Sequence, residues 1–124
     1  MSVQSIADEI KELMSPFIGK GFTYEFFYEK GGDSSCVYVC RFRKGRDYFD
    51  WRETSGETAV HLMTFINGEY RFPSIKTLFP RENKVFIFKH ILKKATFDEC
   101  RVFTAELLKK ELFSGKTEFL GIPL

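Results

Sequence analysis

The stretch RFRKGRDYFDWRE, which runs from Arg41 to Glu53, decides the fold because its pattern reverses about a central turn. Aromatic residues alternate with charged residues on either side of Lys44-Gly45, and a period of two is typical of strands with one buried face. A two-residue turn at this dipeptide sets Arg41 opposite Tyr48. We therefore interpret the stretch as an antiparallel hairpin.

Further turn signals lie on both sides of this hairpin: GGDS at 31–34, TSGE at 54–57 and NG at 67–68. They separate five predicted strands, at about 22–30, 35–43, 46–53, 58–66 and 69–73. Each connection is too short for a crossover, so the strands must form an antiparallel meander. The turns also set the pairing, with Asp50 opposite His61 and Phe65 opposite Tyr70.

Helices are predicted before and after the strand region in the sequence. Apolar residues recur every three or four positions over 3–17, where Ser2 or Ser5 can cap the start and Pro16 ends the pattern. A second helix over 97–113 begins at a Thr96/Glu99 capping box. The segment ENKVFIFKHILKKA, at 82–95, is interpreted as a helix, with a sixth strand over 84–89 as the alternative. The apolar tail KTEFLGIPL is expected to pack against the body.

Length and composition bound the class of protein. The 124 residues suit one domain, 1–124, and the aromatic fraction of 17% favours a sheet-rich core. We therefore expect a two-layer α+β fold, with the N-terminal and C-terminal helices mainly on one face of a five-stranded sheet. A net charge of +2 is far from the strongly basic balance of dedicated nucleic-acid binders. Three cysteines without a disulfide spacing, and no signal peptide or membrane-length apolar run, favour a cytoplasmic protein.

Strand alternation assigns the side chains of the sheet to two faces. One face is apolar and is expected to lie beneath the helices: Phe27, Cys36, Tyr38, Cys40, Phe42, Phe49, Trp51, Val60, Leu62 and Ile66. The other face carries charged residues at its centre: Arg41, Arg43, Tyr48, Asp50, Arg52 and His61. Aromatic and apolar residues flank them: Tyr24, Phe26 and Tyr28 on one side, and Met63, Phe65, Tyr70 and Phe72 on the other.

This second face is the candidate binding site, because Arg and Tyr are enriched at interface hot spots. Its exposure depends on residues 74–95, which could instead fold over it. Asp50 and His61 are the only residues whose predicted pairing resembles a catalytic arrangement, since a carboxylate can orient an imidazole. No nucleophile lies beside them, so we expect no enzyme. No metal site or cofactor motif is found in the sequence.

Three functions follow from this face. The first is a non-catalytic accessory protein that binds another protein, in the manner of an immunity protein that blocks a toxin; a homodimer seam is a variant of it. The second is binding of single-stranded RNA, because RFRKGR places four basic residues within six positions. The third is a small enzyme or ligand carrier that uses Asp50 and His61. No membrane partner is expected.

Overall fold

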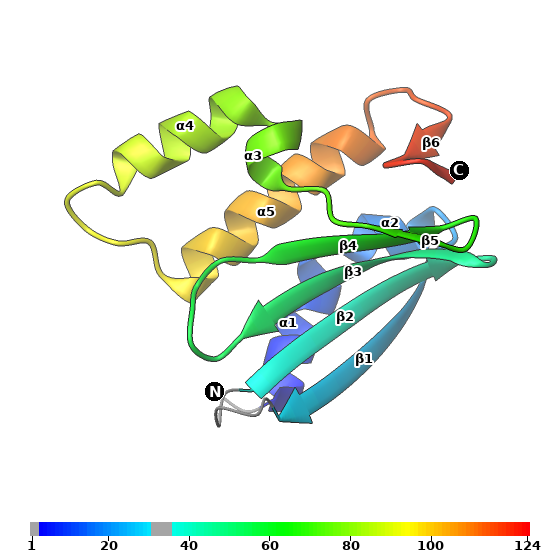
Figure 1. Cartoon of the computed structure of the whole chain (residues 1–124), viewed down its shortest axis with the longest axis horizontal. Coiled ribbons are helices and arrows are strands. Elements are labelled where there is room, and N and C mark those ends of the chain that lie inside the picture. Colours follow the sequence, from blue (N-terminus) through cyan, green and yellow to red (C-terminus); the bar gives the residue numbers. More distant parts are fainter. Residues whose placement is uncertain (1–2, 31–35) are drawn as a thin grey trace.

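The computed structural model describes residues 3–30 and 36–124, and its centre is a five-stranded antiparallel sheet in the order β1-β2-β3-β4-β5 (Figure 1). The strands are β1 (Thr23–Lys30), β2 (Cys36–Lys44), β3 (Asp47–Thr54), β4 (His61–Ile66) and β5 (Glu69–Arg71). Sequence neighbours are spatial neighbours throughout, so the predicted α+β meander is confirmed.

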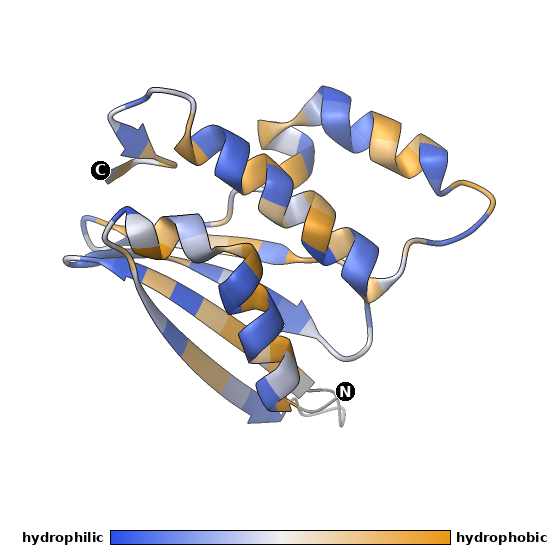
Figure 2. Cartoon of the chain, turned by 180° about the vertical axis from the view of Figure 1, so that it is seen from behind, coloured by the Kyte–Doolittle hydropathy of each residue, from blue (hydrophilic) through white to orange (hydrophobic). Residues whose placement is uncertain are grey.

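The helices lie on one side of this sheet. They are α1 (Val3–Leu13), α2 (Ser15–Gly19), α3 (Ile75–Leu78), α4 (Pro80–Lys89) and α5 (Phe97–Leu112), and a two-stranded hairpin of β6 (Glu118–Phe119) and β7 (Ile122–Pro123) follows them. Figure 2, seen from behind, shows α1 and α2 lying across the sheet. None of the described helices is both long and apolar enough to cross a lipid bilayer.

The N-terminal helical pattern is interrupted at Met14, where a single helix over 3–17 was expected. Pro16 lies in the first turn of α2, a position at which its missing N–H is no loss. Within one continuous helix, the same ring would clash with the carbonyl four residues earlier and remove a hydrogen bond. The chain therefore forms two short helices, and both contribute to the core through Ile10 and Phe17.

The C-terminal helices confirm the main predictions for this region. The Thr96 side chain accepts from the Glu99 N–H at 3.1 Å, and the Glu99 carboxylate accepts from the Thr96 N–H, so the capping box is present. Helix α4 spans 80–89 where a helix over 82–95 was predicted, so the alternative of a sixth strand is wrong and the helix ends six residues before the segment does. It packs outside α5, where Phe86 stacks on Phe103 with ring centroids 4.0 Å apart.

The core is an aromatic cluster between the sheet and α1, α2 and α5. Phe17 makes edge-on contacts with Phe49 and Phe119, with centroids 5.2 and 4.8 Å apart, and Phe42 stacks on Phe49 at 5.0 Å. Trp51 is fully buried in the same cluster, as the alternation predicts. Phe119 and Ile122 bring the small C-terminal hairpin into this core, so the expected packing of the tail is confirmed.

Two strand registers differ from the prediction by two residues. Lys44 pairs with Asp47 and Arg41 with Asp50, so the first turn holds Gly45 and Arg46. Asp50 pairs with Met63, and not with His61 as predicted. A shift of two leaves every side chain on its predicted face, because the side-chain period of a strand is two. The Asn67-Gly68 turn is as predicted, with positive φ at both residues and Phe65 opposite Tyr70.

Strand β1 presents the opposite faces from those predicted. Tyr24 and Phe26 pack against the core, and the Tyr24 hydroxyl donates to the Ala7 carbonyl at 2.8 Å. Tyr28 contacts the ring of Tyr38 on the same side, whereas Phe27 lies on the other face. The predicted turn at 31–34, Ser2 as a cap, and the side chain of Cys36 lie outside the described residues.

Candidate functional site

The second face of the sheet is open. Figure 1 views it with α1 behind the strands, and the chain from 74 to 95 runs to the far side of α5. The described helices therefore leave this face uncovered. We call it the open sheet face, and the described side chains that argue for a site on it are Glu25, Phe27, Arg41, Arg43, Tyr48, Asp50, Arg52, Phe65 and Tyr70.

A buried ion pair lies at the centre of the open sheet face. The Arg41 guanidinium donates to both oxygens of Asp50, at 2.8 and 3.0 Å. The Asp50 side chain is fully buried even though no helix covers it, while that of Arg41 is 22% exposed. Hydrogen bonding to this carboxylate raises the pKa of Arg41 above its ordinary value. The bidentate geometry holds the guanidinium in one orientation.

Arg41 is also one member of a row of flat groups that crosses all five strands. Its guanidinium lies between the rings of Phe27 and Tyr48, at 5.0 and 3.9 Å from their centroids. Tyr48 stacks on Phe65 at 5.1 Å, and Phe65 contacts Tyr70 at 4.8 Å. Burial and a hydrogen bond to Tyr70 raise the pKa of Tyr48. We call these five residues the stacked row.

The other cations of this face are bound differently. Arg43 donates to Glu25 at 3.0 Å, and the two side chains are 35% and 40% exposed. Arg52 has no ion pair among the described residues. Asp50 and Glu25 therefore neutralise two of the three arginines within the face, Arg41 and Arg43, and Arg52 carries the remaining positive charge.

His61 does not form the predicted catalytic arrangement. It lies opposite Arg52 at the end of β4, and its Nε2 contacts the Glu57 carboxylate at 2.7 Å. Asp50 is instead held by Arg41, so the expected Asp50–His61 contact is wrong. The shift in register between β3 and β4 separates the two residues.

A second charged centre, which the sequence interpretation missed, lies on the helical side. Arg101 of α5 is buried and donates to Glu53 of β3 through Nε and Nη2, with a shortest distance of 2.8 Å. Glu53 also accepts from the Trp51 indole N–H at 2.8 Å. The sequence did contain a signal for this centre. Glu53 follows Phe49 and Trp51 at the same spacing of two, so its side chain had to face the core.

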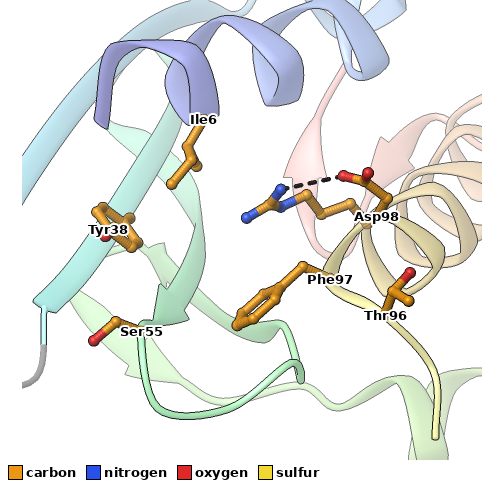
Figure 3. Close-up of a pocket in the computed structure, with 7 residues that line it drawn as sticks. Ile6, Tyr38, Ser55, Thr96, Phe97 and Asp98 are labelled. Carbon is orange, nitrogen blue, oxygen red and sulfur yellow. Dashed lines mark hydrogen bonds and ion pairs between the residues drawn. The ribbon is translucent and has the colours of Figure 1, made fainter. Parts of the chain in front are cut away.

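A hollow of about 400 Å³ opens beside this centre (Figure 3). It is lined by Ile6, Tyr38, Ser55, Thr96, Phe97, Asp98 and Arg101. The remaining nitrogen of Arg101, Nη1, donates to Glu9 at 3.2 Å and contacts Asp98 at 3.5 Å. Burial, together with a hydrogen bond to Asp98, raises the pKa of Glu9. Arg101 is thus fully engaged by carboxylates, and the centre fastens α5 to α1 and β3.

Comparison with known proteins gives no relative. No family model matches the chain, and no match was found among curated proteins or solved structures.

Proposed function

We propose that this chain is a non-catalytic binding protein that holds a protein partner against the open sheet face. The observation that carries the proposal is the stacked row, because its side chains are fixed before any partner arrives. Arg41 is held by two hydrogen bonds and two rings, so little side-chain entropy remains to be lost on binding.

The exposed parts of the face fit a protein surface. Tyr70 is 58% exposed at one edge, Phe72, which follows β5, is 76% exposed, and Phe27 is 39% exposed at the other edge. Aromatic anchors of this kind bury large apolar areas at low entropic cost. Arg52, which has no carboxylate partner among the described residues, would pair with an acidic group of the partner. The expected partner surface is therefore apolar, with a carboxylate placed to reach Arg52.

Single-stranded RNA is the second candidate, because the exposed rings of Phe27 and Tyr70 could stack on bases. The charge of the face argues against it. Asp50 and Glu25 already neutralise Arg41 and Arg43, so phosphates on this face would meet two carboxylates and one arginine, Arg52, that has no ion pair among the described residues. A salt titration separates the two candidates, since phosphate contacts release counterions and make affinity fall steeply with ionic strength.

Site-specific photocrosslinking tests the proposal. A photoreactive phenylalanine analogue is placed at Tyr70, at Phe72 and, as a control, at Phe113, which is 60% exposed at the end of α5. We expect one and the same protein to be crosslinked from Tyr70 and Phe72 in cells, and not from Phe113. With that protein purified, Tyr70→Ala and Arg52→Ala should each weaken binding about tenfold or more.

Three results would count against this function. Crosslinks from Phe113 to the same protein would place its contact elsewhere, and unchanged affinity in the Tyr70→Ala variant would remove the stacked row from the interface. Salt-sensitive crosslinks to RNA would establish the second candidate instead. A crosslink to a second copy of the chain would make the partner a homodimer, which sedimentation at several concentrations checks.

A further inference from the structure

Helix α4 and the turn after it expose an unusual amount of apolar surface. Five side chains here are at least half exposed: Val85 at 50%, Ile87 at 58%, Phe88 at 75%, Ile91 at 72% and Leu92 at 99%. No described residue of α4 is buried. Contiguous apolar surface of this kind on a folded chain marks an interaction site. We call these five residues the α4 apolar surface.

The same segment carries the net positive charge of the chain. Residues 80–95 contain five of the 19 basic residues (Arg81, Lys84, Lys89, Lys93 and Lys94) and one of the 17 acidic residues, Glu82. With histidines neutral, the segment carries a formal charge of +4, and the rest of the chain therefore carries −2. The occupant of this surface must be apolar and anionic.

The segment also projects from the body. Its inward contacts are made by Phe86, which stacks on Phe103, and by His90, which lies 2.8 Å from the Glu99 carboxylate. Figure 1 shows α4 and its following turn at a corner of the molecule, beyond α5 and away from the sheet, and Figure 2 shows apolar residues at this turn. Phe88 lines neither of two hollows that lie between this segment and the body. Arg81, Glu82, Val85 and Lys89 line one, and Ile87, His90, Ile91 and Leu92 line the other.

We propose that the α4 apolar surface docks onto an anionic lipid bilayer, with Phe88, Ile91 and Leu92 in the interfacial layer and the surrounding lysines on the headgroups. Apolar side chains that project from a basic segment enter the boundary between headgroups and acyl chains, and each nearby Lys or Arg adds attraction to acidic lipids. No sequence segment has to cross the bilayer. This membrane contact departs from the sequence-based expectation.

Two other occupants fit the observations less well. A symmetric contact with a second copy would bring two segments of charge +4 together, which like-charge repulsion opposes. An acidic protein helix would lie in one of these hollows, and Phe88, which is 75% exposed and lines neither, would stay outside it. A lipid surface covers the projecting side chains without requiring a groove.

Co-flotation of the full chain with vesicles tests the inference. Vesicles of phosphatidylcholine with 30% phosphatidylserine are compared with vesicles of phosphatidylcholine alone, at low and high salt. We expect binding to the anionic vesicles to exceed binding to the neutral ones by about tenfold or more, and to fall with salt. The double variant Lys93→Ala/Lys94→Ala should lower partitioning about 10- to 30-fold.

An apolar variant and two matched controls complete the design. Ile91→Ser/Leu92→Ser should lower partitioning about tenfold or more, because it removes the side chains that enter the bilayer. Lys76→Ala/Lys110→Ala, which removes two exposed lysines elsewhere, and Phe113→Ser should stay within about twofold of the parent chain. Thermal melts verify that each variant is folded.

Three outcomes would overturn the inference. The first is absence of flotation with anionic vesicles. The second is partitioning that Ile91→Ser/Leu92→Ser leaves unchanged, because the apolar tip would then not enter the bilayer. The third identifies an acidic protein occupant: no flotation with either vesicle, together with binding of a labelled acidic amphipathic peptide that Val85→Ser or Leu92→Ser abolishes. None of these results bears on the crosslinks from Tyr70, so the proposed function is tested separately.

Discussion

Arg41 and Asp50 lie directly opposite each other on β2 and β3, and their two hydrogen bonds bury the carboxylate completely on a face that no described helix covers. The rings of Phe27 and Tyr48 lie on either side of the guanidinium, whose side chain is 22% exposed while that of Asp50 is fully buried. One ion pair therefore stabilises the sheet and also holds the stacked row in place.

The first prediction concerns this pair. Arg41→Ala should lower the free energy of unfolding by about 3 kcal/mol, because it leaves the buried Asp50 carboxylate without its partner. Arg41→Ala/Asp50→Asn should recover part of this loss, since the amide that remains carries no charge. Denaturant titration measures both values. Equal stability of Arg41→Ala and the parent chain would show that water reaches Asp50.

The second prediction concerns the centre in the core. Arg101→Met should lower the free energy of unfolding by about 3–5 kcal/mol, because Glu53 would stay buried beside Trp51 without a cation. Arg43→Met is the matched control: it removes an arginine–glutamate pair of which both members are at least one-third exposed, and should cost less than about 1 kcal/mol. Urea titrations of the two variants give the comparison, and a similar cost for both would contradict the argument.

Turn chemistry and alternation predicted most of this fold for a physical reason. The turns ordered the strands, and errors of two residues in two registers left Trp51 in the core and Arg41 on the open face, because the side-chain period is also two. The same errors placed Asp50 opposite His61, which the actual register separates, since a direct contact across strands requires the register itself. The alternation of apolar and polar residues thus predicts which face of the sheet a side chain lies on more reliably than it predicts which residues pair across strands.

Two features could not be predicted in the same way. The run TYEFFYEK of β1 carries aromatic residues at both parities, so alternation alone does not decide whether Phe26 or Phe27 faces the core. The pairing of Glu53 with Arg101 joins residues 48 apart in the sequence, and it requires knowing where α5 crosses the sheet. Glu53 alone could have been recognised as a buried carboxylate in need of a cation.

The third prediction concerns thiol reactivity. Burial raises the pKa of the Cys40 thiol to about 12, and its side chain is inaccessible beneath α1, so it should resist iodoacetamide at pH 8 in the folded chain. Cys100 is only half-buried and should react faster, although burial raises its pKa as well. Peptide-resolved mass spectrometry measures the two rates. Alkylation of Cys40 at the rate of Cys100 would show that the sheet opens locally.

The fourth prediction concerns the link between α4 and α5. Hydrogen bonds to the Phe86 carbonyl and to Glu99 raise the pKa of His90 above its ordinary 6.5, and the bond to His90 with those to Thr96 lowers the pKa of Glu99 to about 2. The His90 contribution to stability is complete below pH 6.5 and is lost as pH rises through the raised pKa. The Glu99 contribution is complete above its ordinary 4.5 and is lost as pH falls toward 2.

The link should therefore be strongest between pH 4.5 and 6.5. Glu99→Gln tests it, because glutamine keeps the capping box and removes the charge that faces His90. NMR titration of the His90 ring should show its pKa falling in this variant. An unshifted His90 would mean that Phe86 alone holds the ring, and α4 would then be attached to α5 by packing only.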